Sequence, residues 1–267
     1  MGTVMMGYSE QKQTSMRRRA LMVELVGSAS AGKTTLTNSL TQRSAYIRVA
    51  ADISVRKVRH LAVFARTIPM LLPVLLPRRP KSRWLTWDEV KSIVYLKAWP
   101  RVLTQQVQIS SGAILLDQGP VFRLATLHAF GPDILRRPAA KAWWDEMFEQ
   151  WAPVLDLVIC LDAPNPILQQ RINSRDRWHP VQAKPEPKIA QFLNRYRASY
   201  RYVLRRLSSN DGPTVIAFDT STITTGELAS LAISICLNHS LPENNERLAV
   251  RNRTNLVDRT ALVGDRT

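Results

Sequence analysis

The chain has 267 residues, 45% of them hydrophobic, and a formal net charge of +16 at pH 7. This length suits one α/β domain with insertions. Its two cysteines, Cys160 and Cys236, lie far apart in apolar contexts without metal-type spacing, which favours buried thiols in a reducing compartment over a disulfide or a redox pair. The apolar run that follows the arginines at 17–19 is too short for a signal-peptide core, so we expect a cytosolic protein.

Strand-like and helix-like segments alternate along the chain, which predicts an α/β fold with a central parallel sheet of about five strands covered by helices. The expected strands are 21–26, 45–50, 113–117, 155–161 and 214–218. The expected helices are 34–42, 53–61, 89–110, 121–130, 141–151, 166–173, 187–207 and 225–238. Pro100 is expected to break or kink the third of these helices. Trp143, Trp144 and Trp151 recur at near-helical spacing, so we expect them to pack in the core.

Residues 27–35 read Gly-Ser-Ala-Ser-Ala-Gly-Lys-Thr-Thr and match the phosphate-loop pattern G-x-x-x-x-G-K-[ST]. A strand that turns through small residues into a helix N-terminus points several backbone N–H groups at one spot, which suits a polyphosphate. Lys33 can reach the β- and γ-phosphates, and Thr34 can hold Mg²⁺. The expected ATP-binding residues of the loop are Gly27, Ser28, Ala29, Ser30, Ala31, Gly32, Lys33, Thr34 and Thr35. The fold class is therefore a three-layer P-loop NTPase fold.

Two carboxylates follow predicted strands and belong to the same sheet edge. Asp117 closes the strand 113–117 and is placed to bind Mg²⁺ beside Thr34, so we assign it a catalytic role with Lys33. Asp52 closes the second strand and has two interpretations. It either takes a proton from an acceptor hydroxyl or caps the helix that starts at residue 53.

The order of these parts over residues 20–238 resembles the P-loop nucleoside and nucleotide kinases, thymidylate kinase-like members most closely. The resemblance is carried by residues 27–34, 117–119, 161–164, 171–177 and 218–221. It implies a basic lid at 171–185 in which Arg171 and Arg175 close on the phosphates as catalytic residues, with Arg177 as a third candidate. It also implies that the adenine is flanked by Asp219, Thr220 and Ser221.

The acceptor side departs from that family. Thymidylate kinases carry an arginine where this chain has Gln118, whereas Arg123 lies six residues past Asp117. We assign Gln118, Arg123 and Asp52 to the acceptor side and leave the acceptor open. Residues 53–111 stand where such kinases place their acceptor-binding helices.

The segment 61–87 within this insertion contains an apolar run, 68–77, bordered by arginine and lysine, with Trp84 and Trp87 close by. Ten apolar residues are too few to span a bilayer. The segment suits a peripheral membrane interface or an amphiphilic acceptor, or it is a core-packing insertion stiffened by prolines.

Basic residues are concentrated in two inner regions: residues 53–87 hold eight Lys/Arg and no acid, and residues 166–207 hold ten Lys/Arg and two acids. Such regions attract anions, unless they are simply solvated surface. No aromatic-interleaved motif or zinc-ligand pattern supports a nucleic-acid binder, and no guanine-specificity or transporter signature is present.

We therefore predict Mg²⁺-assisted phosphoryl transfer from ATP to a small acceptor that is anionic or amphiphilic. The alternative is a P-loop ATPase that controls attachment to a partner or a membrane. We expect residues 1–19 and 240–267 to be flexible tails around a kinase-like domain at 20–239, and a homodimer is compatible with the sequence.

Overall fold

The computed structural model describes residues 19–50, 65, 83–176, 178–209 and 212–239. Five strands form one sheet in the order β2-β3-β1-β4-β5, and every neighbouring pair is parallel. The strands are β1 (Leu21–Gly27), β2 (Ile47–Val49), β3 (Ala113–Asp117), β4 (Leu157–Asp162) and β5 (Thr214–Asp219). The predicted parallel sheet of five strands is confirmed. Because all strands run the same way, Gly27, Asp117, Asp162 and Asp219 end at one edge of the sheet.

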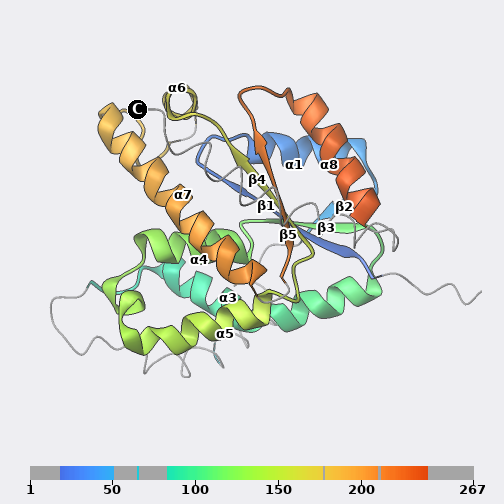
Figure 1. Ribbon diagram of the computed structural model, residues 1–267, viewed down its shortest axis with the longest axis horizontal. Helices are drawn as coiled ribbons and strands as arrows, with labels where there is room; N and C mark the ends of the chain where they lie inside the picture. Colours follow the sequence, from blue (N-terminus) through green and yellow to red (C-terminus); the bar gives the residue numbers. More distant parts are fainter. Residues whose placement is uncertain (1–18, 51–64, 66–82, 177, 210–211, 240–267) are drawn as a thin grey trace, which may run out of the picture.

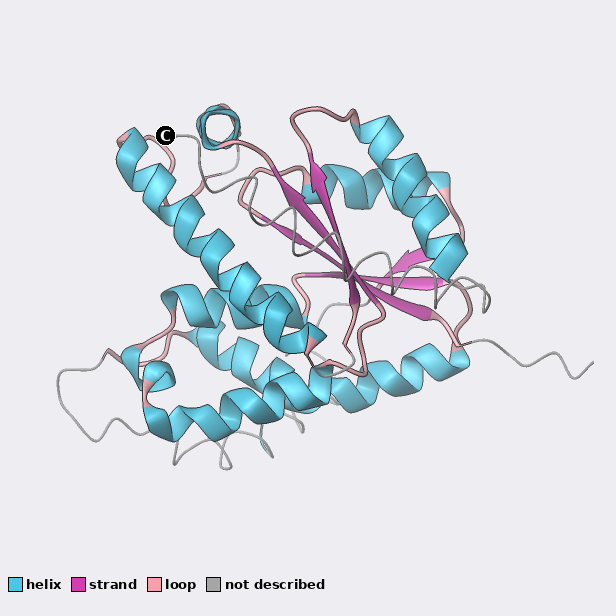
Figure 2. Cartoon of the chain, in the orientation of Figure 1, coloured by secondary structure: helices cyan, strands magenta, loops and turns pink. Residues whose placement is uncertain are grey.

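Helices cover both faces of this sheet, which gives the three predicted layers (Figures 1 and 2). The α-helices described are α1 (Lys33–Arg43), α3 (Trp87–Ile109), α4 (Pro120–Phe130), α5 (Lys141–Trp151), α6 (Asn165–Asn173), α7 (Glu186–Ser208) and α8 (Thr225–His239). Two short 3₁₀ turns, Asp133–Arg136 and Pro138–Ala140, lead from α4 into α5. Each described helix begins and ends within one or two residues of its predicted bounds, because the hydrophobic periodicity of long segments indicates a helix clearly.

Alternation along the strands builds two hydrophobic cores. Met22 and Val26 of β1 point toward α3, α4, α5 and α7, whereas Leu21, Val23 and Leu25 point toward α1, α6 and α8. Successive side chains of a strand face opposite sides of the sheet, so a strand covered on both faces must be apolar throughout. Glu24 is the exception in β1: it faces the α4 layer and is fully buried.

Helix α3 continues without a break through Pro100, so of the two predicted outcomes, a break or a kink, the break is wrong. Proline has no N–H to donate to the carbonyl four residues earlier, which here belongs to Leu96. Trp151 Nε1 donates to that oxygen at 2.9 Å and satisfies it. Pro100 is itself buried, and the packing of α3 against α5 outweighs the local preference.

The three tryptophans pack in the core as predicted, whereas of the two cysteines only Cys236 is buried and Cys160 is partly buried. Trp143, Trp144 and Trp151 are at most 8% exposed and belong to the core. Cys160 and Cys236 are free thiols. No helix among the described residues combines the length and apolarity needed to cross a membrane.

Some predicted features lie outside the described residues. They are the helix at 53–61, Asp52, Arg177, the apolar run 68–77 and both terminal tails. From the segment 61–87, Trp84 and Trp87 are described and are 69% and 58% exposed.

Candidate functional site

The phosphate loop connects β1 to α1 with the backbone that its sequence requires. Gly27 has a φ of +143°, and a Cβ there would lie 1.9 Å from the carbonyl oxygen of Leu161. Gly32 has a φ of +90° and precedes α1 without a side-chain cap. The first N–H groups of α1 therefore face the loop with no side chain competing for them, at the positive end of the helix dipole.

Lys33 folds back across this loop. Its ammonium group donates hydrogen bonds to the carbonyl oxygens of Gly27 at 2.9 Å and Ser28 at 2.8 Å. An ammonium group has three donors, so one remains for a ligand. Burial lowers the pKa of Lys33 to about 8, while the charge of Asp117 acts in the opposite direction. An anion bound in the loop would therefore favour the charged form of Lys33.

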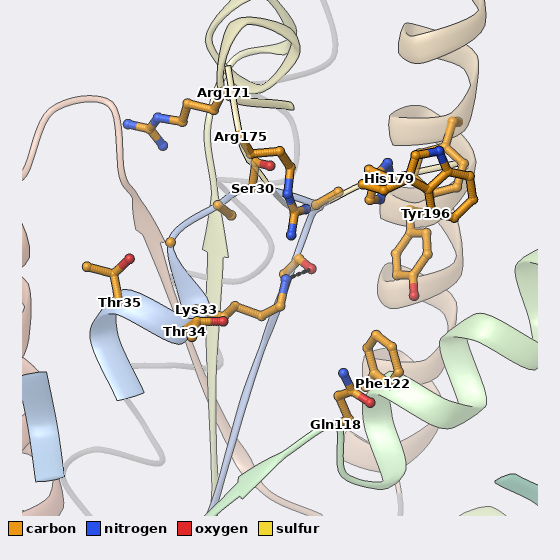
Figure 3. A pocket seen from close by; sticks show the side chains of 16 residues that line it. Ser30, Lys33, Thr34, Thr35, Gln118, Phe122, Arg171, Arg175, His179 and Tyr196 are labelled. Carbon is orange, nitrogen blue, oxygen red and sulfur yellow. Dashed lines mark hydrogen bonds between the residues drawn. The ribbon is translucent and has the colours of Figure 1, made fainter. Parts of the chain in front are cut away.

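A cavity of about 520 Å³ opens above the loop, between the lid segment, α4 and α7 (Figure 3). Eight of the nine predicted loop residues, all except Ser28, form one wall. The remaining lining residues are Gln118, Phe122, Arg171, Arg175, Trp178, His179, Phe192 and Tyr196. The cavity thus has a polar, cationic side at the loop and an aromatic side at α4 and α7. The aromatic side was not predicted, because its members come from separate segments of the chain.

The two predicted lid arginines occupy different parts of this cavity. Arg171, on α6, donates to the hydroxyl of Thr220 and to the carbonyl oxygen of Thr220, both at 2.9 Å. Arg175 reaches over the phosphate loop in Figure 3, and its positive charge acts on Lys33. The structure therefore joins Arg171 to the segment predicted to flank adenine and places Arg175 nearer the phosphate loop.

The segment after β5 is ordered by its own side chains. Asp219 accepts hydrogen bonds from the backbone N–H of Ser221 at 2.8 Å and from its hydroxyl at 2.5 Å. Thr220 donates its N–H and its hydroxyl to the carbonyl oxygen of Asp162. Hydrogen bonds thus fix residues 219–221 to one another, to Asp162 and to Arg171, which lines the cavity.

The donors available for Mg²⁺ are the Thr34 hydroxyl and the Asp117 carboxylate. Both are exposed, and the charge of Asp117 raises the pKa of Lys33, so its carboxylate is close to the loop. Among the described residues no group of three or more His, Cys, Asp or Glu forms a metal cluster. Two oxygen donors fit Mg²⁺, since this ion keeps several waters and takes substrate phosphates as further ligands.

The predicted acceptor-side residues are separated by the structure. Gln118 follows β3 with a φ of +56° and lines the cavity. Arg123 faces α3 instead: its guanidinium lies 4.4 Å from the ring centroid of Tyr95 and donates to the Ser92 hydroxyl at 3.3 Å. Arg123 thus contacts α3, which belongs to the segment predicted for the acceptor side, and Arg123 itself does not line the cavity.

Glu24 is a residue of this site that the sequence did not reveal. Its Oε2 accepts the backbone N–H of Val121 and its Oε1 that of Phe122, both at 2.9 Å. Gly119 makes this contact possible, because a Cβ there would lie 2.7 Å from the Glu24 carboxyl carbon. Glu24 therefore caps α4 from the neighbouring strand, where Gly119 itself offers no side chain. It fixes the turn that carries Asp117 and Gln118.

No protein-family model and no curated protein sequence matches the chain. Solved structures do match. A thymidylate kinase from Candida albicans gives a TM-score of 0.50 at 13% identity, covering 81% of this chain and 91% of that chain. A deoxyadenosine kinase from M. mycoides with bound dATP gives 0.46 at 12% identity, covering 80% and 100%, and the same kinase with bound products gives 0.47 at 16% identity, covering 80% and 98%. The match to the thymidylate kinase shows that the chain shares the P-loop kinase fold; at 13% identity the likeness concerns the fold alone.

Proposed function

We propose that this protein transfers the γ-phosphoryl group of ATP, with Mg²⁺, to a small-molecule acceptor. One observation carries the proposal: the cations that face the cavity are oriented by uncharged oxygens. Lys33 is held by two carbonyl oxygens and Arg171 by the hydroxyl and carbonyl of Thr220. Their positive charges are therefore not neutralised by the groups that hold them.

Two other arginines of the described chain, Arg197 and Arg19, are instead paired with carboxylates. Arg197 donates to Asp162 at 2.6 and 3.1 Å, and Arg19 donates to Asp156 at 2.5 and 2.9 Å. Among the ion pairs of the described residues, none involves Lys33, Arg171 or Arg175. Because unneutralised charge in a partly buried cavity is costly, such a site favours an anionic ligand, and the loop geometry suits a polyphosphate.

The roles of the residues follow from their positions. The N–H groups at the start of α1 bind the β-phosphate region, and Lys33 bridges the phosphates and the loop carbonyls. Arg175 stabilises the charge that spreads over the oxygens of the transferring phosphoryl group, because a planar guanidinium matches that distribution. Arg171 holds residues 219–221 against the adenine. Mg²⁺, bound through Thr34 and Asp117, would supply further neutralisation of the phosphate charge.

The acceptor is proposed to enter from the side of Gln118 and Phe122. These two residues face the loop across the cavity, and Tyr196 of α7 lies beside Phe122 with a ring-centroid distance of 6.4 Å. The proposed acceptor is a small anionic or amphiphilic molecule. Asp52 retains both interpretations, as the base that takes the acceptor proton or as a helix cap.

The proposal is tested by incubating the protein with a metabolite extract, ATP and Mg²⁺ and searching for new phosphorylated species by mass spectrometry. Lys33→Ala should lower product formation by at least about 100-fold, the scale on which one transition-state charge acts. Lys188→Ala, on the exposed side of α7, is the matched control and should behave as wild type.

Circular dichroism must show both variants folded. Release of inorganic phosphate with no phosphorylated acceptor would favour the ATPase alternative, in which ATP controls attachment to a partner. A folded Lys33→Ala protein with wild-type turnover would refute the assignment of the loop.

A further inference from the structure

The lid segment contains a turn that is held by hydrogen bonds between its own residues. We call residues 173–176 and 178–183 the lid turn. Gln182 holds it together: its Oε1 accepts the backbone N–H of His179 at 3.2 Å, and its Nε2 donates to the carbonyl oxygen of Arg175 at 3.0 Å. Asn173 adds a second tie by accepting the N–H of Ala183 at 3.2 Å. The backbones that carry Arg175 and His179 are thus fixed relative to one another.

The His179 ring is oriented by two contacts, one with the backbone of Val181 and one with the ring of Phe192. Its Nδ1 accepts the backbone N–H of Val181 at 3.4 Å. Its ring packs edge-on against Phe192 of α7, with centroids 5.5 Å apart and an interplanar angle of 82°. An acceptor at Nδ1 places the proton of the neutral ring on Nε2. Since His179 lines the cavity, Nε2 is the ring nitrogen left to face a ligand.

The charges around His179 favour the neutral ring in the empty cavity. Burial lowers its pKa, and the positive charges of Arg175 and Lys33 lower it further. A neutral N–H donor adds a hydrogen bond for an anion without adding repulsion to these two cations. A bound phosphate would reverse the effect and stabilise the protonated ring.

We propose that His179 is a phosphate-contacting residue, whose Nε2–H donates to the same polyphosphate that Lys33 and Arg175 bind. Figure 3 shows Arg175 above the phosphate loop, and His179 farther toward α7, near Tyr196. This inference rests on the proposed function, because it requires the loop to bind phosphate. His179 supplies what the two lid arginines do not: an uncharged hydrogen-bond donor on a short side chain whose position is fixed by the lid turn.

Two substitutions separate a contact with phosphate from a role in the turn. His179→Gln retains a donor near the position of Nε2, whereas His179→Asn retains an acceptor near Nδ1 for the Val181 N–H and has no group at Nε2. We expect kcat to fall about 10- to 100-fold in His179→Asn and to stay within about fivefold of wild type in His179→Gln. Wild-type kcat in His179→Asn, or equal losses in both variants, would assign His179 to the structure of the turn and overturn the proposal.

A titration makes the test independent of the acceptor. The chain has four histidines, so the His179 imidazole signal can be assigned in an NMR spectrum from its absence in His179→Gln. Adding inorganic tripolyphosphate should raise the pKa of His179 by about one unit or more. His128, whose Nδ1 lies 2.9 Å from the Ser199 hydroxyl outside the cavity, should not respond.

Calorimetry on the same samples distinguishes the two possible failures. Tripolyphosphate that binds without moving the His179 pKa would overturn this inference and leave the phosphate site standing. Absence of tripolyphosphate binding would remove the phosphate site and the proposed function with it.

Discussion

The buried Glu24 allows a sharp test of what holds the site together. In Glu24→Gln the side chain keeps its size and one carbonyl oxygen, but an NH₂ group replaces one acceptor. That NH₂ meets the backbone N–H of either Val121 or Phe122, each of which donates to Glu24 at 2.9 Å. Leaving a buried donor unpaired costs about 1–3 kcal/mol. For a domain of this size, each kcal/mol corresponds to about 2–4 °C in Tm.

The pH dependence of this loss follows from the pKa of Glu24. Burial raises that pKa from 4.5 to about 8, outweighing the two backbone hydrogen bonds and the charge of Arg123. The folded state then binds the proton more tightly than the unfolded state. The stabilisation is complete below pH 4.5 and is lost as the pH rises toward 8. The slope is about 1.4 kcal/mol per pH unit, on the order of 5 kcal/mol in all.

Glutamine does not titrate, so the stability deficit of Glu24→Gln should shrink as the pH rises from 5 and should change sign before pH 8, because the titration of Glu24 outweighs the loss of about 1–3 kcal/mol. Urea unfolding at several pH values, without Mg²⁺ or nucleotide, measures the deficit directly. Glu149→Gln, at an exposed position of α5, is the control and should show a small, nearly constant difference. A deficit that grows with pH would refute the reasoning, since it would mean that Glu24 is ionised and that the N-terminus of α4 stabilises its charge.

Three further predictions concern the cavity. Arg175→Ala should lower kcat by about 1000-fold with little change in the Kd for ATP, because its charge acts on the transition state. Arg171→Ala should mainly raise the Kd for ATP, because Arg171 supports Thr220. Kinetics and calorimetry measure the two quantities, and equal losses of kcat in both variants would contradict this division of roles. Asp117→Asn should raise the Mg²⁺ concentration for half-maximal turnover by about tenfold, and an unchanged metal titration would exclude Asp117 as a ligand. Gln182→Ala should act through Arg175, so adding it to Arg175→Ala should slow turnover no further; additive losses would show an independent effect.

The parts of this molecule that the sequence predicts are those specified by neighbouring residues. Strand β1, the loop and helix α1 follow one another within 23 residues, from Leu21 to Arg43, and the backbone of the loop is set by Gly27 and Gly32. Periodicity then predicts the remaining helices and strands, and the parallel order follows from their alternation. The loop side of the cavity was predicted on this basis, whereas residues 219–221 were assigned from the resemblance to the kinases and lie outside the cavity lining.

The parts that the sequence does not predict depend on contacts between distant segments. Glu24 reads as a polar residue in an apolar strand, and its partner Val121 is 97 positions away. The carbonyl left open by Pro100 is satisfied by Trp151, which lies 55 positions from Leu96, so the helix survives where local chemistry predicts a break. The position of Glu24 and the continuity of α3 both depend on tertiary packing, which a local sequence pattern does not predict.

Backbone strain is concentrated at the cavity. Among the described residues, the non-glycine residues with positive φ are Ser30, Gln118 and Ala183, at 60°, 56° and 58°. Ser30 and Gln118 line the cavity, and Ala183 belongs to the lid turn. Each left-handed residue costs on the order of 1 kcal/mol, and such strain persists where surrounding structure fixes the backbone. Here the phosphate loop, the Glu24 contact with α4 and the bond from Ala183 to Asn173 supply that support. The loop, the turn after β3 and the lid turn are therefore held in these conformations by the surrounding structure, which is what preorganisation for the proposed anionic ligand would require.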